Sequence, residues 1–204
     1  MSETKQYHIN DIFYSLQGEG FYTGTPAVFV RFAGCNLRCD FCDTDFSLKE
    51  TLTAGQIVSR TLSLLPDTTS SSASYRPLLV LTGGEPALQA DDSLLDSLHK
   101  AGFYITAETN GTHPLPEAID WITCSPKYAP VILKRVNELK VVYRGQDVES
   151  YYQHIEARHY FLQPCDLSSV SNDNSTTLRD TLGYILLHPH WRLSLQTHKL
   201  LHIP

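Results

Sequence analysis

The chain has 204 residues, 42% of them hydrophobic, and a formal net charge of −6, which is an ordinary composition for a globular protein. Its length suffices to bury a core without disulfides, so we expect one domain over residues 1–204. It has no apolar run of the roughly 20 residues that span a bilayer, no signal-peptide core and no basic stripe. We therefore expect a cytoplasmic protein that contacts neither membrane nor nucleic acid.

The predicted elements alternate between short strands and helices. Runs of β-branched and aromatic residues predict strands at 27–32, 78–82, 103–108, 121–124, 138–143, 160–163 and 192–196. Amphipathic patterns predict helices at 53–65, 88–101, 147–157 and 175–188. Residues 66–77 are rich in Ser, Thr and Pro and are expected to form a surface loop. The connection from 108 to 121 carries two prolines and is too short for a crossover helix.

Polar motifs follow the ends of several predicted strands. In chain order they are GCNLRC, TGGEP, ETNGT, SPK and QPCD. In a parallel barrel or sheet, the loops after the strands share one face, and active sites are built there. We therefore expect these motifs to meet in space.

The thiols are concentrated in one motif. Of five cysteines, Cys35, Cys39 and Cys42 form a CxxxCxxC pattern, which suits metal ligation better than a disulfide framework. Structural zinc normally takes four protein ligands, and no fourth Cys or His lies nearby. Thiolates are also the usual ligands of iron–sulfur clusters, on which three cysteines leave one iron open.

This spacing, with Phe41 directly before the last cysteine, resembles the signature of the radical S-adenosylmethionine (SAM) enzymes. The resemblance implies that Cys35, Cys39 and Cys42 hold a 4Fe–4S cluster, that SAM binds its open iron, and that the reduced cluster generates a 5′-deoxyadenosyl radical. The TGGEP segment at 82–86 matches the family segment that runs beside the methionine amino group.

A narrower resemblance extends along nearly the whole chain. The stretch YSLQGEGFYTGTPAVFVRFAGCNLRCDFCDT, followed by LTGGEP, AETNGT, CSPK, ELKVV, YFLQPCD and LSLQTHKLLHIP, resembles the 7-carboxy-7-deazaguanine synthases. That family implies a lyase that converts 6-carboxy-5,6,7,8-tetrahydropterin to 7-carboxy-7-deazaguanine with loss of ammonia, in 7-deazapurine (queuosine-type) biosynthesis. The implied fold is α/β: a partial, abbreviated TIM-like radical SAM barrel of about six parallel strands with few helices.

The resemblance also assigns the substrate site. Substrate contacts carry over to Leu16, Gln17, Gly18, Glu19, Arg31, Thr82, His198 and Pro204, with residues 190–204 as a C-terminal pocket segment. Glu19 is the expected acceptor for pterin N–H groups. Thr44 is the expected ligand of Mg2+, a hard ion that often keeps waters and takes few protein ligands. Together with the three cluster cysteines, Thr44 completes the expected catalytic set.

For SAM, the resemblance implies contacts from the cysteine loop and from four further segments. The expected residues are Phe41, Cys42, Asp43, Gly84, Glu108, Ser125, Pro126, Lys127, Gln163, Pro164, Cys165 and Asp166. The expected partners are a flavodoxin or ferredoxin reductant and a second copy of the chain in a homodimer.

Two other functions remain open at this point. A glycyl-radical-enzyme activase shares the CxxxCxxC motif but acts on a protein, and it has no reason to contain the pterin-site residues. The second is a zinc-stabilised binding module. Metal analysis distinguishes it from an iron–sulfur enzyme, because it would contain about one zinc and no sulfide.

Overall fold

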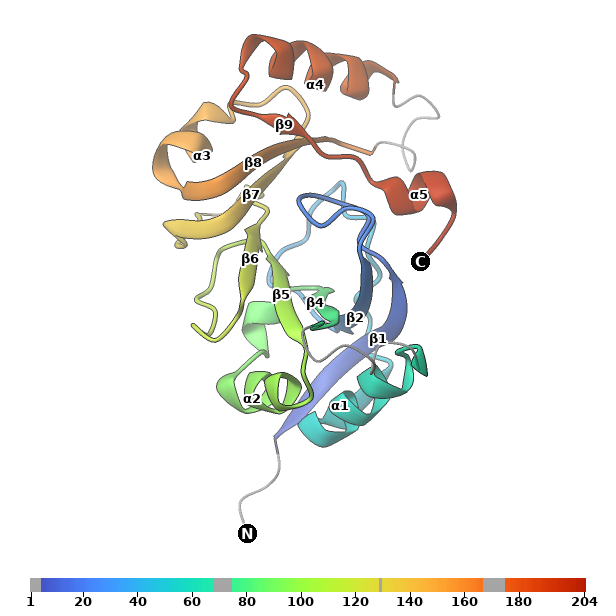
Figure 1. The fold of residues 1–204 in the computed structure, drawn as a ribbon. Helices are drawn as coiled ribbons and strands as arrows, with labels where there is room; N and C mark the ends of the chain where they lie inside the picture. Colours follow the sequence, from blue (N-terminus) through green and yellow to red (C-terminus); the bar gives the residue numbers. More distant parts are fainter. Residues whose placement is uncertain (1–4, 68–74, 129, 167–174) are drawn as a thin grey trace.

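A computed structural model describes residues 5–67, 75–128, 130–166 and 175–204, and its centre is one nine-stranded sheet that curves around an interior (Figure 1). The strand order is β3-β1-β2-β4-β5-β6-β7-β8-β9. The strands are β1 Gln6–Leu16, β2 Pro26–Phe32, β3 Glu50–Thr53, β4 Leu78–Gly83, β5 Tyr104–Thr109, β6 Trp121–Cys124, β7 Arg135–Tyr143, β8 Glu156–Pro164 and β9 Arg192–Leu193.

The sheet is parallel from β2 through β9, and only β1 and β3 add antiparallel pairs at one edge. The predicted α/β class with a mostly parallel sheet and few helices is confirmed. Every predicted strand is present, although β9 is limited to two residues. The strands β1 and β3 were not predicted, because β1 mixes polar and apolar residues and its register shifts between Ile9 and Asp11, which breaks the period of two.

The helices lie close to their predicted ranges. They are α1 Ala54–Ser63, α2 Asp92–Lys100, α3 Glu149–His154, α4 Ser175–Leu187 and α5 Thr197–Leu201, with a 3-10 turn η2 at Pro86–Leu88. A capping box between Thr53 and Gln56 starts α1. Asp91 caps α2 and therefore starts it later than the predicted residue 88. The short helix α5 was not predicted.

The core has two parts on the outside of the curve and a smaller one inside it. One outer cluster joins β1, β2, β4 and β5 to α1 and α2, with Leu79 and Leu81 fully buried. The other joins β7 and β8 to α3 and α4 around Trp191. Figure 1 shows these helix pairs at opposite ends of the sheet. No crossover helix joins β5 to β6 in the described residues, as expected from the short connection.

The loop that joins β1 to β2 turns into the interior of the curve. Its ends are tied by the Gln17 N–H, which donates to the Thr25 carbonyl over 2.8 Å. The ring of Phe21 stacks on Trp121 of β6 at 4.9 Å and lies 4.4 Å from the ring of His159 of β8. These ring contacts of Phe21 hold the β1–β2 loop against β6 and β8.

Two further expectations concern the 66–77 loop and membrane-spanning helices. Most of the predicted 66–77 surface loop lies outside the described residues. Within the described part of the chain, no helix is both long and apolar enough to cross a membrane.

Candidate active site

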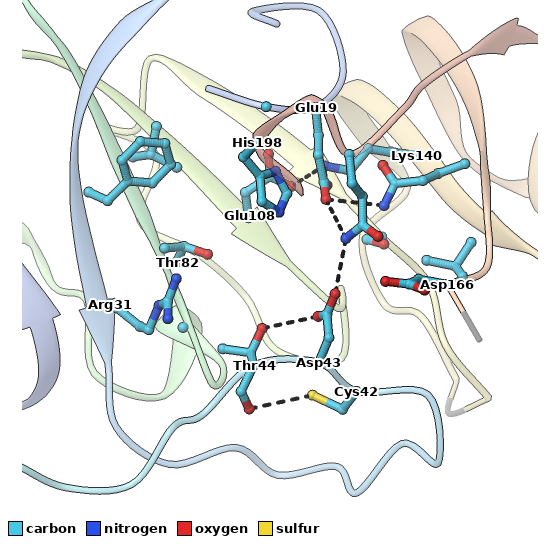
Figure 2. A pocket seen from close by; sticks show the side chains of 18 of the residues that line it. Glu19, Arg31, Cys42, Asp43, Thr44, Thr82, Glu108, Lys140, Asp166 and His198 are labelled. Carbon is cyan, nitrogen blue, oxygen red and sulfur yellow. Dashed lines mark hydrogen bonds and ion pairs between the residues drawn. The ribbon is translucent and has the colours of Figure 1, made fainter. Parts of the chain in front are cut away.

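A cavity of about 460 Å³ opens where the ends of the parallel strands meet the β1–β2 loop, the cysteine loop and α5 (Figure 2). Of the residues predicted from the sequence, those that line it are Leu16, Gln17, Gly18, Glu19, Arg31, Cys35, Cys39, Phe41, Cys42, Asp43, Thr44, Thr82, Gly84, Glu108, Ser125, Lys127, Gln163, Pro164, Cys165, Asp166, His198 and Pro204. Pro126 is the one predicted site residue that does not line it. The motifs that follow separate strands therefore do meet.

The cysteine loop presents three thiols to this cavity. Cys35, Cys39 and Cys42 are free of disulfides and partly or fully accessible. Among the described residues, no three Cys, His, Asp or Glu side chains are close enough to share one metal ion. A 4Fe–4S cluster instead binds each cysteine through a different iron. Three reduced thiols on one cavity wall thus fit a cluster.

Gly84 is required by the contact between the TGGEP loop and the cysteine loop. A Cβ at Gly84 would lie 1.7 Å from the carbonyl oxygen of Gly34. The Glu85 N–H donates to that same oxygen over 3.0 Å. The close approach that requires this glycine is therefore between two protein loops.

Glu85 braces the loops behind the cavity. Its side chain is 0% exposed and accepts from the Thr109 hydroxyl at 2.7 Å and the Asn110 N–H at 2.8 Å. Asn110 in turn donates through Nδ2 to Asn36 Oδ1 at 3.0 Å, which reaches the cysteine loop. Sequence reasoning gave Glu85 no role, because nothing local reveals that a carboxylate in a loop is fully buried.

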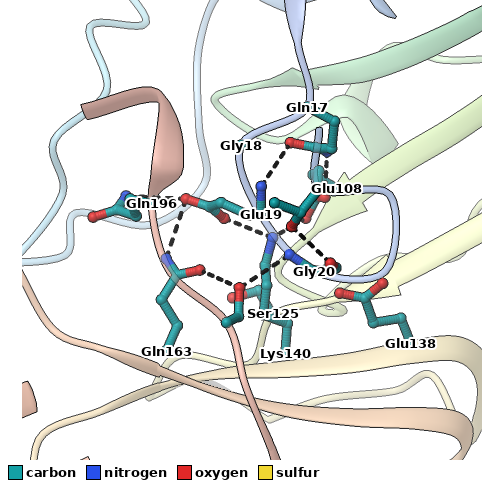
Figure 3. Close-up of polar contacts among 12 residues, drawn as sticks. Gln17, Gly18, Glu19, Gly20, Glu108, Ser125, Glu138, Lys140, Gln163 and Gln196 are labelled. Atoms are coloured by element: carbon teal, nitrogen blue, oxygen red, sulfur yellow. Dashed lines mark hydrogen bonds and ion pairs between the residues drawn. The ribbon is translucent and has the colours of Figure 1, made fainter. Parts of the chain in front are cut away.

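A buried ion-pair cluster forms the wall between the β1–β2 loop and β5 (Figure 3). Lys140 of β7, 3% exposed, donates to Glu19 Oε2 at 2.6 Å and to Glu108 Oε2 at 3.0 Å. Burial opposes ionisation of Glu19, but Lys140 outweighs it and lowers the Glu19 pKa to about 2. Burial raises the pKa of Glu108 despite Lys140. Glu19 is therefore an anion across the physiological range.

Amide groups complete the surroundings of the two carboxylates. Gln163 Nε2 and Gln196 Nε2 donate to Glu19 Oε1 over 3.1 and 3.0 Å. Gln17 Nε2 donates to Glu108 Oε1 over 3.3 Å. Lys140 donates to the other oxygen, Oε2, of each carboxylate. Both oxygens of Glu19 and both oxygens of Glu108 therefore accept hydrogen bonds.

The C-terminal segment closes against the QGEG turn. The Thr197 N–H and hydroxyl both donate to the Gly18 carbonyl, over 3.0 and 2.9 Å. A Cβ at Gly18 would lie 2.2 Å from His198 Nδ1, so the glycine leaves room for that ring. The Ser15 hydroxyl donates to the Pro204 carbonyl over 2.8 Å. These hydrogen bonds hold the C-terminal segment against the QGEG turn and β1.

Five charged or polar residues of the cavity wall were not among the predicted site residues: Thr109, Asn110, Lys140, Gln196 and Lys199. Lys199 pairs with Asp43 of the cysteine loop and with Asp166 after β8. Lys140 did leave a signal, since it interrupts the apolar run ELKVVY of a predicted interior strand.

Arg31 and Phe41 are held by ring contacts. The Arg31 guanidinium lies over the Phe13 ring at 5.3 Å, and its buried Nε has no hydrogen-bond partner among the described residues. Phe41 has Lys127 at 5.7 Å and Arg144 at 5.3 Å from its ring centroid. Because Arg31 lines the cavity, it is a cation that this wall offers to an anion.

Comparison with known proteins fits this arrangement. Residues 29–159 match the family model of the radical SAM superfamily. A 7-carboxy-7-deazaguanine synthase from Bacteroides thetaiotaomicron is 52% identical, over 96% of this chain and 97% of that protein. This chain belongs to the 7-carboxy-7-deazaguanine synthase family. The enzyme of the same name from Bordetella pertussis is 41% identical over 97% of this chain and 99% of its own.

The fold agrees with that of a solved structure. The crystal structure of QueE from Escherichia coli superposes with a TM-score of 0.72 and 28% identity, and the match covers 93% of each chain. The resemblance read from the motifs is therefore confirmed, and so is the radical SAM type of fold. Membership of the radical SAM superfamily implies a 4Fe–4S cluster and SAM, and the three free thiols on the cavity wall fit that pair.

Proposed function

We propose that this family member converts 6-carboxy-5,6,7,8-tetrahydropterin to 7-carboxy-7-deazaguanine and ammonia, acting as a Mg2+-dependent carbon–nitrogen lyase in 7-deazapurine (queuosine-type) biosynthesis. One observation carries the proposal: the cavity beside the three thiols is also lined by an ionised Glu19 and by Arg31. A tetrahydropterin with a carboxylate needs an acceptor for its ring N–H groups and a cation for its carboxylate.

Glu19 is the anion suited to the N–H edge of the pterin ring. Its carboxylate keeps four lone-pair directions, of which Lys140, Gln163 and Gln196 use three. Arg31, a cation of the cavity wall, suits the substrate carboxylate. Thr82 and His198, which also line the cavity, complete the proposed subsite (Figure 2).

Thr44 is the proposed protein ligand of Mg2+. Its hydroxyl faces the cavity and lies 3.5 Å from Asp43 Oδ1, next to the cluster cysteines. A Mg2+ ion there would bind substrate oxygens and waters and orient the substrate carboxylate.

Cys35, Cys39 and Cys42 are the proposed cluster ligands. When bound, the cluster and SAM supply the 5′-deoxyadenosyl radical. The chain orients SAM through residues at the ends of the strands and the cysteine loop, for which we propose Phe41, Cys42, Asp43, Gly84, Glu108, Ser125, Pro126, Lys127, Gln163, Pro164, Cys165 and Asp166. Pro126 is the residue of this set that does not line the cavity. We therefore propose that it acts on SAM binding only through the shape of the loop formed by Ser125, Pro126 and Lys127.

The remaining parts of the proposal have two sources. The length and composition of the chain predict a single domain and a cytoplasmic location, and the family resemblance implies flavodoxin or ferredoxin as electron donor and a homodimer. Exposed leucines on α4, such as Leu182 and Leu186, support a contact with a second copy. Light scattering on the purified holoenzyme measures the oligomeric state directly.

The deciding experiment is an anaerobic incubation of cluster-reconstituted protein with dithionite, SAM, Mg2+ and 6-carboxytetrahydropterin, followed by mass spectrometry. We expect 7-carboxy-7-deazaguanine from the wild type and none from Cys39→Ala. The same incubation without Mg2+ tests the metal requirement. Formation of 5′-deoxyadenosine alone would leave the radical chemistry but refute the substrate, and a protein that contains zinc without sulfide would refute both.

A further inference from the structure

Lys140 is a buried cation that contacts residues of both proposed subsites (Figure 3). Its ammonium group lies 2.6 Å from Glu19 of the proposed substrate subsite and 3.0 Å from Glu108 of the proposed SAM subsite. It sits on β7, an interior strand whose pairing with β6 and β8 fixes the backbone. The lysine is therefore held by the sheet, while both carboxylates lie on the cavity wall.

Resting on the function proposed above, we propose that Lys140 is a positioning residue that keeps Glu19 ionised and oriented for the substrate N–H groups and fixes Glu19 relative to Glu108. The two glutamates come from different parts of the chain, the β1–β2 loop and the end of β5. Lys140 is the group bonded to both of them. Its loss leaves two neighbouring carboxylates on a buried wall with no cation between them.

The charged groups around Glu19 determine what that loss would do. Lys140 faces it from β7, Glu108 from β5, Lys127 from the loop after β6 and His198 from α5. Glu138 of β7 lies next to Lys140 and Glu108, and Asp43 of the cysteine loop lies next to His198. Without Lys140, burial and the charge of Glu108 both disfavour the anion, so the pKa of Glu19 rises. A protonated Glu19 has lost one acceptor site and binds the pterin N–H groups less well.

The test is calorimetric binding of 6-carboxytetrahydropterin to the cluster-containing, SAM-bound, unreduced enzyme. In the wild type, we expect a Kd that changes little from about pH 8 to about pH 6. In Lys140→Met, we expect binding that is about 10- to 100-fold weaker, with the loss growing as the pH falls. Any pH dependence that comes from His198 or the ligand appears in both proteins and cancels in the ratio.

Further variants separate charge from packing. Lys140→Arg keeps the charge and should keep the flat pH profile. The double variant Glu108→Gln/Lys140→Met removes the competing carboxylate and should recover the flat profile and part of the affinity. Lys134→Met, an exposed lysine at the start of the same strand region, is the matched control and should bind like the wild type. Iron content is measured for every variant.

The outcomes distinguish this inference from the proposed function. If the wild type does not bind the pterin at all, the function is wrong. If the wild type binds it and Lys140→Met binds with the same Kd and pH profile, the positioning role is wrong. A weakening that is independent of pH and is not relieved in the double variant also overturns it, because it indicates packing alone. If Lys140→Met does not fold, Lys140→Gln, which is neutral but keeps a hydrogen-bond donor, carries the same expectation.

Discussion

The buried carboxyl of Glu138 gives a prediction whose size follows from the structure. Glu138 is 2% exposed; its Oε2 accepts the Phe21 N–H, and its Oε1 has no partner among the described residues. Burial raises the Glu138 pKa from 4.5 to about 7, Lys140 opposes this rise, and Glu108 adds to it. The folded protein therefore favours the neutral form of Glu138 much more than the unfolded chain does.

The sign follows from linkage. Below pH 4.5 the Glu138 side chain is protonated in both the folded and the unfolded state, so its ionisation does not change the free energy of unfolding. As the pH rises from 4.5 to about 7, only the unfolded state loses the proton, and the free energy of unfolding falls. At about 1.4 kcal/mol for each pH unit between the two pKa values, the cost above pH 7 is about 3 kcal/mol. Glu138→Gln keeps an acceptor for Phe21 and removes that cost. We expect the Tm of the variant to exceed that of the wild type by about 6 to 12 °C at about pH 8 and to differ little at pH 4.5.

The assay is thermal unfolding of the cluster-free protein, followed by circular dichroism at both pH values. Glu156→Gln is the matched control, because Glu156 is exposed at the start of β8 and its removal should change Tm little at either pH. The reasoning fails if Glu138→Gln changes Tm by the same amount at both pH values, or if it lowers Tm at about pH 8. The first result would mean that folding does not shift the Glu138 pKa, and the second would mean that the carboxyl is stabilised as an anion in the folded state.

Two further substitutions test how the cavity wall is built. Gly84→Ala should destabilise the protein by about 1–3 kcal/mol and lower its iron content, because the new Cβ collides with the Gly34 carbonyl beside Cys35. Gly55→Ala is the control, since its new Cβ would have open space. Equal iron content in the two variants would contradict the argument. Removal of Pro204 should raise the KM for the pterin by about tenfold with the cluster intact, because the contact with Ser15 is lost. Steady-state kinetics and iron analysis check this, and unchanged kinetics would refute a role for the chain end.

The local part of the site could be predicted from the sequence, and the part made by distant contacts could not. The CxxxCxxC loop is a continuous stretch whose thiols indicate metal ligation, and TGGEP is a continuous stretch that was recognised by its resemblance to the family segment. Lys140 is different: its role depends on Glu19 and Glu108, which are 121 and 32 residues away and reach it only through the fold. The strand β1 was missed for a related reason, since its bulge and polar residues hide the alternation that would identify it.

The cluster side and the proposed substrate side of the cavity are formed by different parts of the chain. The cluster side is one loop braced by neighbours such as Asn110 and Glu85. The proposed substrate side needs the β1–β2 loop and the C-terminal segment to meet, through Thr197 and Gly18 at a separation of 179 residues. Since ordering both ends of the chain costs conformational entropy that only their mutual contacts repay, the substrate side should be the more easily disrupted. Damage to the C-terminal segment is therefore expected to reduce pterin binding before it reduces cluster content.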